Sequence, residues 1–297
     1  MPEGRRLIAV CGHEATYGRG VRDLVGPEVT VVANGRELFR AVQEARRRGE
    51  ECCAVPMTFG RDPELVADAA RTLRAVPTAD RSGILLARPL GTVQHLVGWL
   101  RAAAGRVPET SALLITAPSG GPFEDAELYR VAHLVRTHTG RRLVEVAFTG
   151  GDPDPAEGAG RCRLLGASRV ALLPAAFVPG EVPEVAGVRI EQAGPPLSPT
   201  ALGRVLAERA ADALRRWRDH GDNGIVTGLG AADNHGHHHT HPPGEGHDHH
   251  HSHEHGSGHE HEHEHEHEHE HEHRQPYPDQ HTHPHVHGAG RAIRSTA

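Results

Sequence analysis

The sequence contains no lysine, few aromatic residues and no long apolar run. Arginine supplies all 32 of its basic Lys or Arg positions, and aromatic residues make up 3% of the 297 residues. Any hydrophobic core must therefore be built from Val, Leu, Ile and Ala. No apolar stretch approaches the roughly 20 residues of a membrane-spanning helix, and the charged N-terminus lacks the apolar segment of a signal peptide. These absences predict a cytoplasmic protein with no membrane span.

Cysteine is also scarce, and its four positions show neither a paired metal-ligand spacing nor the pattern of a disulfide-rich secreted domain. Cys11 stands two residues before His13, so the two could form a soft ligand pair, but the apolar run before Cys11 favours the buried end of a strand. Cys52 and Cys53 lie inside another apolar run and are predicted to be core residues, and Cys162 stands alone.

Charge divides the chain into two unequal parts. Residues 1–220 hold 29 Arg against 26 acidic residues, whereas residues 221–297 hold 3 Arg against 13 acidic residues. The first part is close to neutral, so it offers no basic field for nucleic acid. About 220 residues can bury a sizeable core, as one domain or as two of half that size.

Histidine, in contrast, is abundant and concentrated near the C-terminus. Of the 28 histidines, all but five lie between His235 and His287, and residues 259–273 are a strict His-Glu alternation. This segment has almost no apolar residues to offset the entropy of ordering it, so we expect it to be disordered. Neutral imidazole binds Co²⁺, Ni²⁺, Zn²⁺ and Cu²⁺. The predicted metal ligands of this tail are His259, His261, His263, His265, His267, His269, His271 and His273.

Two other interpretations of the tail are a purification tag and a polar linker with an accidental bias. Its length, and its interruption by Gly, Pro, Asp and Glu, argue against a tag, and its histidine density argues against a linker. The histidines outside the tail are sparse. His95, His133 and His138 fall in helical stretches, where packing or surface roles are favoured.

Residues 1–220 alternate short β-branched runs with amphipathic stretches, which predicts βαβ units and a parallel sheet. The order occurs twice, with a period of roughly 105 residues, which indicates duplication of one unit. We therefore predict an α/β fold of two similar doubly wound parallel-sheet halves, 1–107 and 108–220, followed by a linker and His-rich tail, 221–297. Expected strands are 7–11, 29–33, 52–55 and 84–87, then 112–116, 144–148, 170–174 and 187–190; helices are expected near 35–49, 62–75, 92–104 and 198–218.

The carboxyl ends of the first and third strands carry the most informative polar residues. Ligands gather at the carboxyl ends of strands in doubly wound sheets. The first strand is followed by Gly12, His13 and Glu14, where the glycine permits close approach to the backbone. The third is followed by residues 56–64, Pro-Met-Thr-Phe-Gly-Arg-Asp-Pro-Glu.

Several segments, in their order along the chain, carry a resemblance to a known family: Gly12-His13-Glu14-Ala15, Val55-Pro56-Met57-Thr58-Phe59-Gly60, Pro89-Leu90-Gly91, Val144-Glu145-Val146-Ala147-Phe148, and Gly166-Ala167-Ser168-Arg169-Val170 before Leu173-Pro174. They resemble the class II tetrapyrrole chelatases of the sirohydrochlorin cobaltochelatase (CbiX-like) type, over about residues 5–215. That family opens with a strand followed by Gly-His-Gly-Ser, and some members carry His-rich segments. The resemblance implies a lyase that inserts a divalent metal into sirohydrochlorin or a related precorrin in cobalamin biosynthesis.

The chain departs from the family at two places. The family has a second metal-binding histidine in a Gly-x-His pattern after its third strand, where this chain has Gly60-Arg61-Asp62 in the first half and Pro179-Gly180-Glu181 in the second. The second half also has Thr116-Ala117-Pro118-Ser119-Gly120 in place of the first histidine. We therefore expect the active site in the first half and a structural role for the second, with oxygen ligands completing the site.

The resemblance assigns roles to the loop residues. His13 is expected to hold the metal or accept a pyrrole proton, with Glu14 as a second catalytic group and Asp62 as a metal ligand. Glu64 is a further candidate oxygen ligand or proton acceptor. Gly12, Thr58, Gly60 and Arg61 are expected to bind substrate, Arg61 through a substrate carboxylate. The metal is a substrate, cobalt being favoured and nickel or iron being the alternatives, and no organic cofactor is expected.

Simpler interpretations of these residues stay open. Asp62-Pro63-Glu64 is also typical of a helix start, with Asp62 as N-cap. Arg61 could be a solvated loop residue, and Met57 and Phe59 fit ordinary packing as well as a flat apolar slot.

Three functions follow: a chelatase whose tail stores or delivers metal, a non-catalytic metal store or metallochaperone on a degenerate chelatase scaffold, and a tetrapyrrole carrier. The expected partners are a tetrapyrrole and divalent metal ions. No feature of the sequence sets an oligomeric state.

Overall fold

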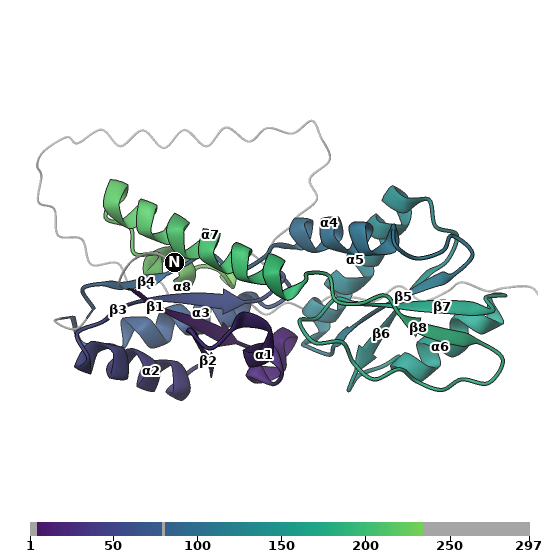
Figure 1. Cartoon of the computed structure of the whole chain (residues 1–297), viewed down its shortest axis with the longest axis horizontal. Helices are drawn as coiled ribbons and strands as arrows, with labels where there is room; N and C mark the ends of the chain where they lie inside the picture. The colour runs from purple at the N-terminus through teal and green to yellow at the C-terminus, as the bar shows by residue number, and fades with distance from the viewer. Residues whose placement is uncertain (1–4, 79–80, 234–297) are drawn as a thin grey trace, which may run out of the picture. The chain divides into compact units, whose positions relative to one another are not determined.

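The computed structural model describes residues 5–78 and 81–233 (Figure 1). The first half runs β1 (Arg5–Cys11), a short 3₁₀ helix η1 (His13–Gly18), α1 (Val21–Val25), β2 (Val29–Ala33), α2 (Arg36–Arg47), β3 (Glu51–Met57), α3 (Pro63–Arg74), β4 (Ile84–Leu86) and α4 (Val93–Ala104). The second runs β5 (Ala112–Pro118), α5 (Pro122–Thr139), β6 (Val144–Thr149), α6 (Pro155–Leu164), β7 (Arg169–Pro174), β8 (Arg189–Gln192) and α7 (Pro199–His220), and α8 (Ile225–Leu229) follows.

Each half contains one four-stranded parallel sheet, and the two sheets have the same strand order. The first is ordered β2-β1-β3-β4 and the second β6-β5-β7-β8. In the first sheet Cys11 pairs with Met57 of β3 and with Ala33 of β2, so the carboxyl ends of these three strands meet at one edge. The predicted α/β fold of two similar doubly wound halves is confirmed, and each strand lies within a few residues of its expected range.

Side chains of each strand alternate between two apolar layers, as the period-two geometry of a strand requires. In β1, Leu7 and Ala9 face one layer, whereas Ile8 and Val10 face the other. The layer around Ile8 and Val10 is completed by α2, α3 and Ile225 of α8. The opposite layer is continuous with the core of the second half, so one hydrophobic core runs through both halves.

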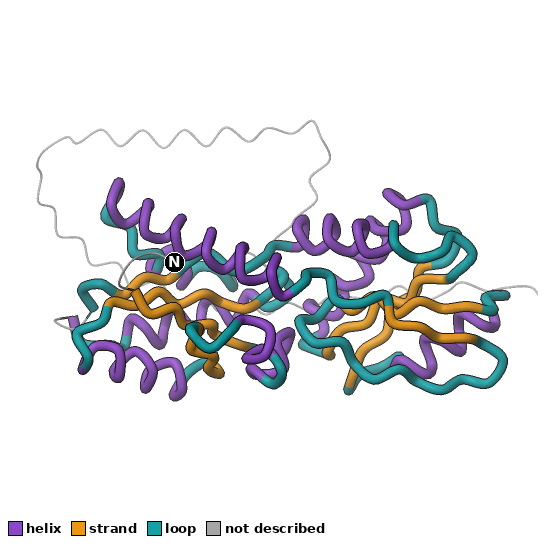
Figure 2. The backbone as a smooth tube through the Cα atoms, viewed as in Figure 1, coloured by secondary structure: helices purple, strands orange, loops and turns teal. Residues whose placement is uncertain are grey.

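The last long helix of each half packs on the other half. α4 follows β4 in the chain but contacts α5 and β7, whereas α7 follows β8 but contacts α1, β3 and β4. Arg209 and Arg216 of α7 donate hydrogen bonds to the Leu90 and Leu86 carbonyls in the first half. The strands, helices and connections can be followed in Figure 2. The helix expected near 198–218 is thus present, but it covers the first sheet instead of completing the second half.

Residues 221–233, expected to be linker, extend the first half instead. The Leu86 amide donates a hydrogen bond to the Asn223 carbonyl, at 2.8 Å, and Ile225 of α8 is buried against the first sheet. A Cβ at Gly228 would lie 2.6 Å from the Leu86 side chain, so α8 packs closely where glycine leaves room. The Gly- and Asn-rich composition of this stretch had favoured a linker because such residues are typical of loops.

Among the described helices, none combines the length and the apolar character that crossing a bilayer would require. The His-Glu repeat, with the predicted ligands between His259 and His273, lies outside the described residues.

Candidate functional site

The candidate site lies where the loops after β1 and β3 meet. The chain leaves β1 toward β2 on one side and returns through β3 on the other, so these loops flank the switch point of the first sheet. Doubly wound sheets bind ligands at such a point. The loop after β1 carries Gly12, His13 and Glu14, and the loop after β3 carries residues 58–62. The tertiary structure therefore brings together the two segments that the sequence analysis singled out.

His13 and Asp62 form the central pair of this site. His13 Nδ1 lies 2.9 Å from Asp62 Oδ2, and Asp62 Oδ1 accepts a hydrogen bond from the Leu65 amide at 2.9 Å. Asp62 is thus the N-cap of α3, as one interpretation of the sequence predicts, and a partner of His13 as well. Because a carboxylate accepts from Nδ1–H, Nε2 is left with the lone pair that can bind a metal or a proton.

Gly12 explains how Asp62 can come so close. A Cβ at Gly12 would lie 2.4 Å from Asp62 Oδ2, which no side chain can tolerate. Gly60, in the facing loop, has φ +101°, and a Cβ there would lie 2.5 Å from the Val93 amide nitrogen. Both expected substrate-binding glycines therefore permit close approaches within the protein. At Gly12 the approaching group is a carboxylate of the site itself.

The surroundings of His13 favour its protonated form. Burial by itself lowers the pKa of the imidazole, but the hydrogen bond and negative charge of Asp62, with the charge of Glu14, outweigh burial and raise the pKa of His13 above its ordinary value. A metal ion that binds Nε2 must compete with this proton, so metal binding at His13 should strengthen as pH rises.

Glu14 is fully buried behind His13. Its Oε2 accepts a hydrogen bond from the Phe59 amide at 2.7 Å. Burial raises the pKa of Glu14, against the opposing effects of the Arg61 charge and of hydrogen bonds from Thr58 and Phe59. Thr58 itself is also buried, and its Oγ1 accepts hydrogen bonds from the Gly60 amide at 2.9 Å and the Asp62 amide at 3.2 Å. The Thr58 hydroxyl thus shapes the loop after β3.

Arg61 is the largest fully buried side chain among the described residues. Its Nε donates to the Glu124 carbonyl at 3.1 Å and its Nη2 to Asp125 Oδ1 at 3.4 Å. Its Nη1 lies 4.0 Å from Glu14 Oε1. Arg61 is therefore neither a solvated loop residue nor a residue lining a cavity. It joins the first-half site to the start of α5 in the second half.

The second half also covers the imidazole of His13. A Cβ at Gly120 would lie 2.9 Å from His13 Nε2, so the backbone of this glycine packs over the ring nitrogen. His13 Nε2, Glu14 Oε1 and Arg61 Nη1 are all buried without a hydrogen-bond partner. Each unsatisfied buried polar group costs about 1–3 kcal/mol. Three such atoms in one place are an unusual concentration for a folded protein.

A large cavity begins beside Asp62. It has a volume of about 1160 Å³ and lies at the carboxyl ends of β3 and β4, between the starts of α3 and α4, α8 and part of α5. Thr58, Gly60 and Asp62, three of the predicted site residues, line it. Its other notable lining residues were not identified from the sequence: Arg88, Arg130, Arg216 and the exposed Phe123.

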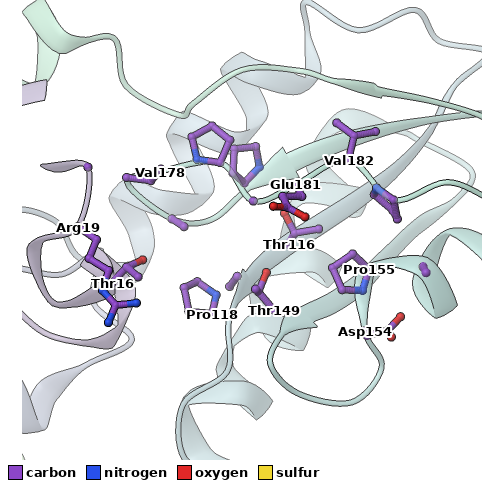
Figure 3. Close-up of a pocket in the computed structure, with 18 residues that line it drawn as sticks. Thr16, Arg19, Thr116, Pro118, Thr149, Asp154, Pro155, Val178, Glu181 and Val182 are labelled. Carbon is purple, nitrogen blue, oxygen red and sulfur yellow. The ribbon is translucent and has the colours of Figure 1, made fainter. Parts of the chain in front are cut away.

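A second cavity, of about 670 Å³, occupies the equivalent switch point of the second half (Figure 3). Thr116 and Pro118 at the end of β5 and Thr149 at the end of β6 contribute to its lining. Figure 3 shows Arg19, from the first half, on one side and Glu181 on the other. The second half therefore keeps a cavity at the position where it has lost the histidine.

The remaining candidates lie apart from this pair. Glu64 is exposed and pairs with Arg71. Phe59 is buried and stacks on Phe177 with ring centroids 4.1 Å apart, and Met57 is also buried, so ordinary packing is the interpretation that holds. Cys11 is buried, which raises the pKa of its thiol to about 12, and the buried end of a strand is the interpretation that holds.

The other histidines of the body have structural or surface positions, as expected. His95 belongs to the capping box of α4, where its Nδ1 accepts a hydrogen bond from the Thr92 amide at 3.1 Å. His133 and His138 are exposed on α5. Over residues 5–78 and 81–233, no group of three or more His, Cys, Asp or Glu side chains is arranged to hold a metal ion. His13 is therefore the one imidazole at the candidate site within the described part.

Comparisons with known proteins found similarity at the level of structure. No protein-family model matches the sequence, and no curated protein matches it. The crystal structure of the sirohydrochlorin chelatase SirB from Bacillus subtilis subspecies spizizenii in complex with cobalt is 11% identical and covers 73% of this chain and 97% of its own, with a TM-score of 0.47. SirB from Bacillus subtilis with Fe³⁺ is 13% identical and covers 73% of this chain and 98% of its own, with a TM-score of 0.44.

Proposed function

We propose that this protein inserts a divalent metal ion, with cobalt favoured, into sirohydrochlorin or a related tetrapyrrole. The observation that carries the proposal is the pairing of His13 with Asp62, 2.9 Å apart, where Asp62 lines a cavity of about 1160 Å³. The sequence resemblance to class II chelatases supports the same function, because Gly12-His13 occupies the position of the family's Gly-His.

Metal insertion into a tetrapyrrole requires no covalent intermediate with the protein. The macrocycle must be held, two pyrrole N–H protons must leave and a partly dehydrated metal ion must arrive. With Nδ1 directed to Asp62, His13 Nε2 is a lone pair of fixed orientation, suited to holding the metal or taking a proton. Glu14 lies buried behind the ring, where the Phe59 amide holds its carboxyl group.

The cavity beside Asp62 suits a large anionic and partly apolar substrate. Arg88 and Arg130 have half or more of their side chains exposed and line the cavity with Arg216, so they offer guanidinium groups to substrate carboxylates, in which sirohydrochlorin is rich. Phe123 is 77% exposed there and offers an aromatic face. We propose that the macrocycle occupies this cavity with its centre toward His13.

The His-rich tail then serves as an accessory reservoir that concentrates metal for the site. Affinities of nitrogen ligands for divalent metals follow the Irving–Williams order, so the tail by itself cannot select cobalt over nickel, copper or zinc. Selectivity in this proposal comes from the first-half site or from the metal supply.

The test is an anaerobic assay in which metallation of sirohydrochlorin by Co²⁺ is followed by its absorbance spectrum. The full chain should accelerate metallation above the background rate, and His13→Ala should lower the acceleration by about a hundredfold or more. His133→Ala, on the exposed surface of α5, is the matched control and should leave the rate unchanged. Equal rates with and without the full chain would contradict the proposal.

The second candidate is a metal store or metallochaperone without catalysis. The absence of a three-ligand cluster within residues 5–78 and 81–233 favours it. Equilibrium dialysis against Co²⁺ and the metallation assay together separate the two functions. A store binds metal through the tail, loses that binding when all 23 histidines from His235 to His287 are replaced by alanine, and gives no metallation above background.

A further inference from the structure

We propose that the loop of residues 119–121 in the second half is a latch over His13, held closed by Asp125 and Arg61, and that it must move before a ligand reaches His13 Nε2. The inference deepens the proposed function and rests on it only for the identity of the incoming ligand, a divalent metal ion. Asp125 is thereby assigned as a positioning residue of the site, contributed by the half that has no histidine at the equivalent loop.

The first step of the argument is the cover itself. Gly120 packs so closely on the imidazole that a Cβ there would lie 2.9 Å from His13 Nε2. Nδ1 of the same ring is engaged by Asp62 at 2.9 Å. Nε2 is buried and has no hydrogen-bond partner. In this closed arrangement both ring nitrogens are therefore out of reach of a dissolved metal ion.

The second step is the hold that Asp125 has on the covering loop. Asp125 Oδ1 accepts a hydrogen bond from the Gly120 amide at 2.9 Å, and its Oδ2 accepts one from the Ser119 hydroxyl at 2.9 Å. One carboxylate thus fixes two consecutive residues of the loop. The glycine that follows, Gly121, leaves the turn into α5 without a side chain to impede it.

The third step is the connection to the first half. Arg61, from the loop after β3, donates its Nη2 to Asp125 Oδ1 at 3.4 Å and its Nε to the Glu124 carbonyl at 3.1 Å. Its side chain is fully buried. The same loop carries Asp62, the partner of His13, so adjacent residues hold the imidazole and its cover.

The fourth step is that closure leaves polar groups unsatisfied. His13 Nε2, Glu14 Oε1 and Arg61 Nη1 are all buried without partners in the closed arrangement. Opening would let water or a ligand reach these three atoms, so the polar groups favour opening while the Asp125 hydrogen bonds favour closure. Because these two contributions oppose each other, the free-energy difference between the closed and open loop should be small enough for the loop to move.

The experiment measures the reactivity of individual histidines in the full chain. Diethyl pyrocarbonate is applied at about pH 8, where imidazoles of ordinary pKa are neutral, and modification of His13 and of exposed His133 is quantified by mass spectrometry of their separate peptides. Reaction with a thiol reagent is followed in parallel, because all four cysteines are buried and report any loss of the fold.

In the wild-type chain, His13 should react at least about tenfold more slowly than His133. Asp125→Ala and the milder Asp125→Asn should each raise the His13 rate several-fold while the thiols stay unreactive. Glu157→Ala, which removes an exposed carboxylate and its ion pair with Arg161 on α6, is the matched control and should change neither the His13 nor the His133 rate.

Two results would overturn the latch. One is a wild-type His13 that already reacts as fast as His133, and the other is an unchanged His13 rate in a folded Asp125→Asn or Asp125→Ala protein. The measurement involves neither tetrapyrrole nor metal. A failed chelatase assay therefore leaves the latch standing, and an absent latch leaves the chelatase proposal standing.

Discussion

Single residues at this site serve structure and chemistry together. Asp62 caps α3 through Oδ1 and orients His13 through Oδ2. The capping role could be predicted from Asp62-Pro63-Glu64, because N-cap and Pro-N1 signals are local in sequence. The contact with His13 could not, since 49 residues separate the two positions and only the pairing of β1 with β3 brings them together.

We expect Asp62→Asn to lower the stability of the protein in a pH-dependent way. Asparagine caps helices about as well as aspartate, so the loss isolates the charge beside His13. Because Asp62 helps to raise the pKa of His13, the pair contributes stability that is fully present below about pH 6.5, the ordinary pKa of histidine, and is lost as pH rises through the folded-state pKa.

The measurement is the free energy of unfolding in urea of both proteins at about pH 5.5 and about pH 8.5. The difference between wild type and variant should be larger at the lower pH. The His-rich tail titrates equally in both proteins, so it cancels in the comparison. A difference of the same size at both pH values would show that the charge of Asp62 does not act through His13.

At the scale of elements, the strands and long helices were predictable because their signals are periodic and local. The helices α2, α3, α4 and α7 begin and end within a few residues of their expected ranges. No ranges were predicted for α5 and α6, and the two five-residue helices α1 and α8 were not foreseen. Segments so short have little periodicity, and α8 is stabilised mainly by burial against the first sheet and α3.

This account of α8 predicts a contrast between adjacent residues. Ile225 is 4% exposed, whereas Val226, on the same helix, is 80% exposed. In the full chain Ile225→Ala should lower the free energy of unfolding by about 2–4 kcal/mol, whereas Val226→Ala should change it by less than about 0.5 kcal/mol. Urea unfolding followed by circular dichroism measures both. Equal effects would mean that α8 does not pack on the first half in solution.

At the scale of the whole described body, α4 and α7 join the two halves into one packing unit, because each helix packs on the half to which it does not belong by sequence. α7 lies on the first sheet and α4 on the second half, and the core is continuous between them. Phe59 of the first half, Phe177 of the second and Trp99 of α4 meet within this core. Neither half can bury its apolar faces without a helix that belongs to the other by sequence.

The halves should therefore unfold in one cooperative transition. The chain has two tryptophans, Trp99 in α4 and Trp217 in α7, so Trp99→Phe and Trp217→Phe leave one fluorescent reporter each. In each variant the urea midpoint from fluorescence should coincide with that from far-ultraviolet circular dichroism. Fluorescence and circular dichroism midpoints that separate would indicate halves that fold independently.

The sequence by itself determined the α/β class, the two similar halves and the succession of strands along the chain, because each depends on local patterns or on repetition; it also singled out Gly12-His13 as a candidate. It also indicated the neighbourhood of the site, since the carboxyl ends of β1 and β3 must meet at one sheet edge.

Only the tertiary structure decided which groups surround His13. Gly120, Asp125 and the buried Arg61 come from loops whose sequences carry no sign of the contact, and they meet because α4 and α7 tie the halves into one core. Cys52 and Cys53 are a smaller example: the sequence predicts that both are core residues, but only the structure shows which apolar layer each one enters. They are adjacent in sequence but lie in different apolar layers, because successive residues of a strand point to opposite faces.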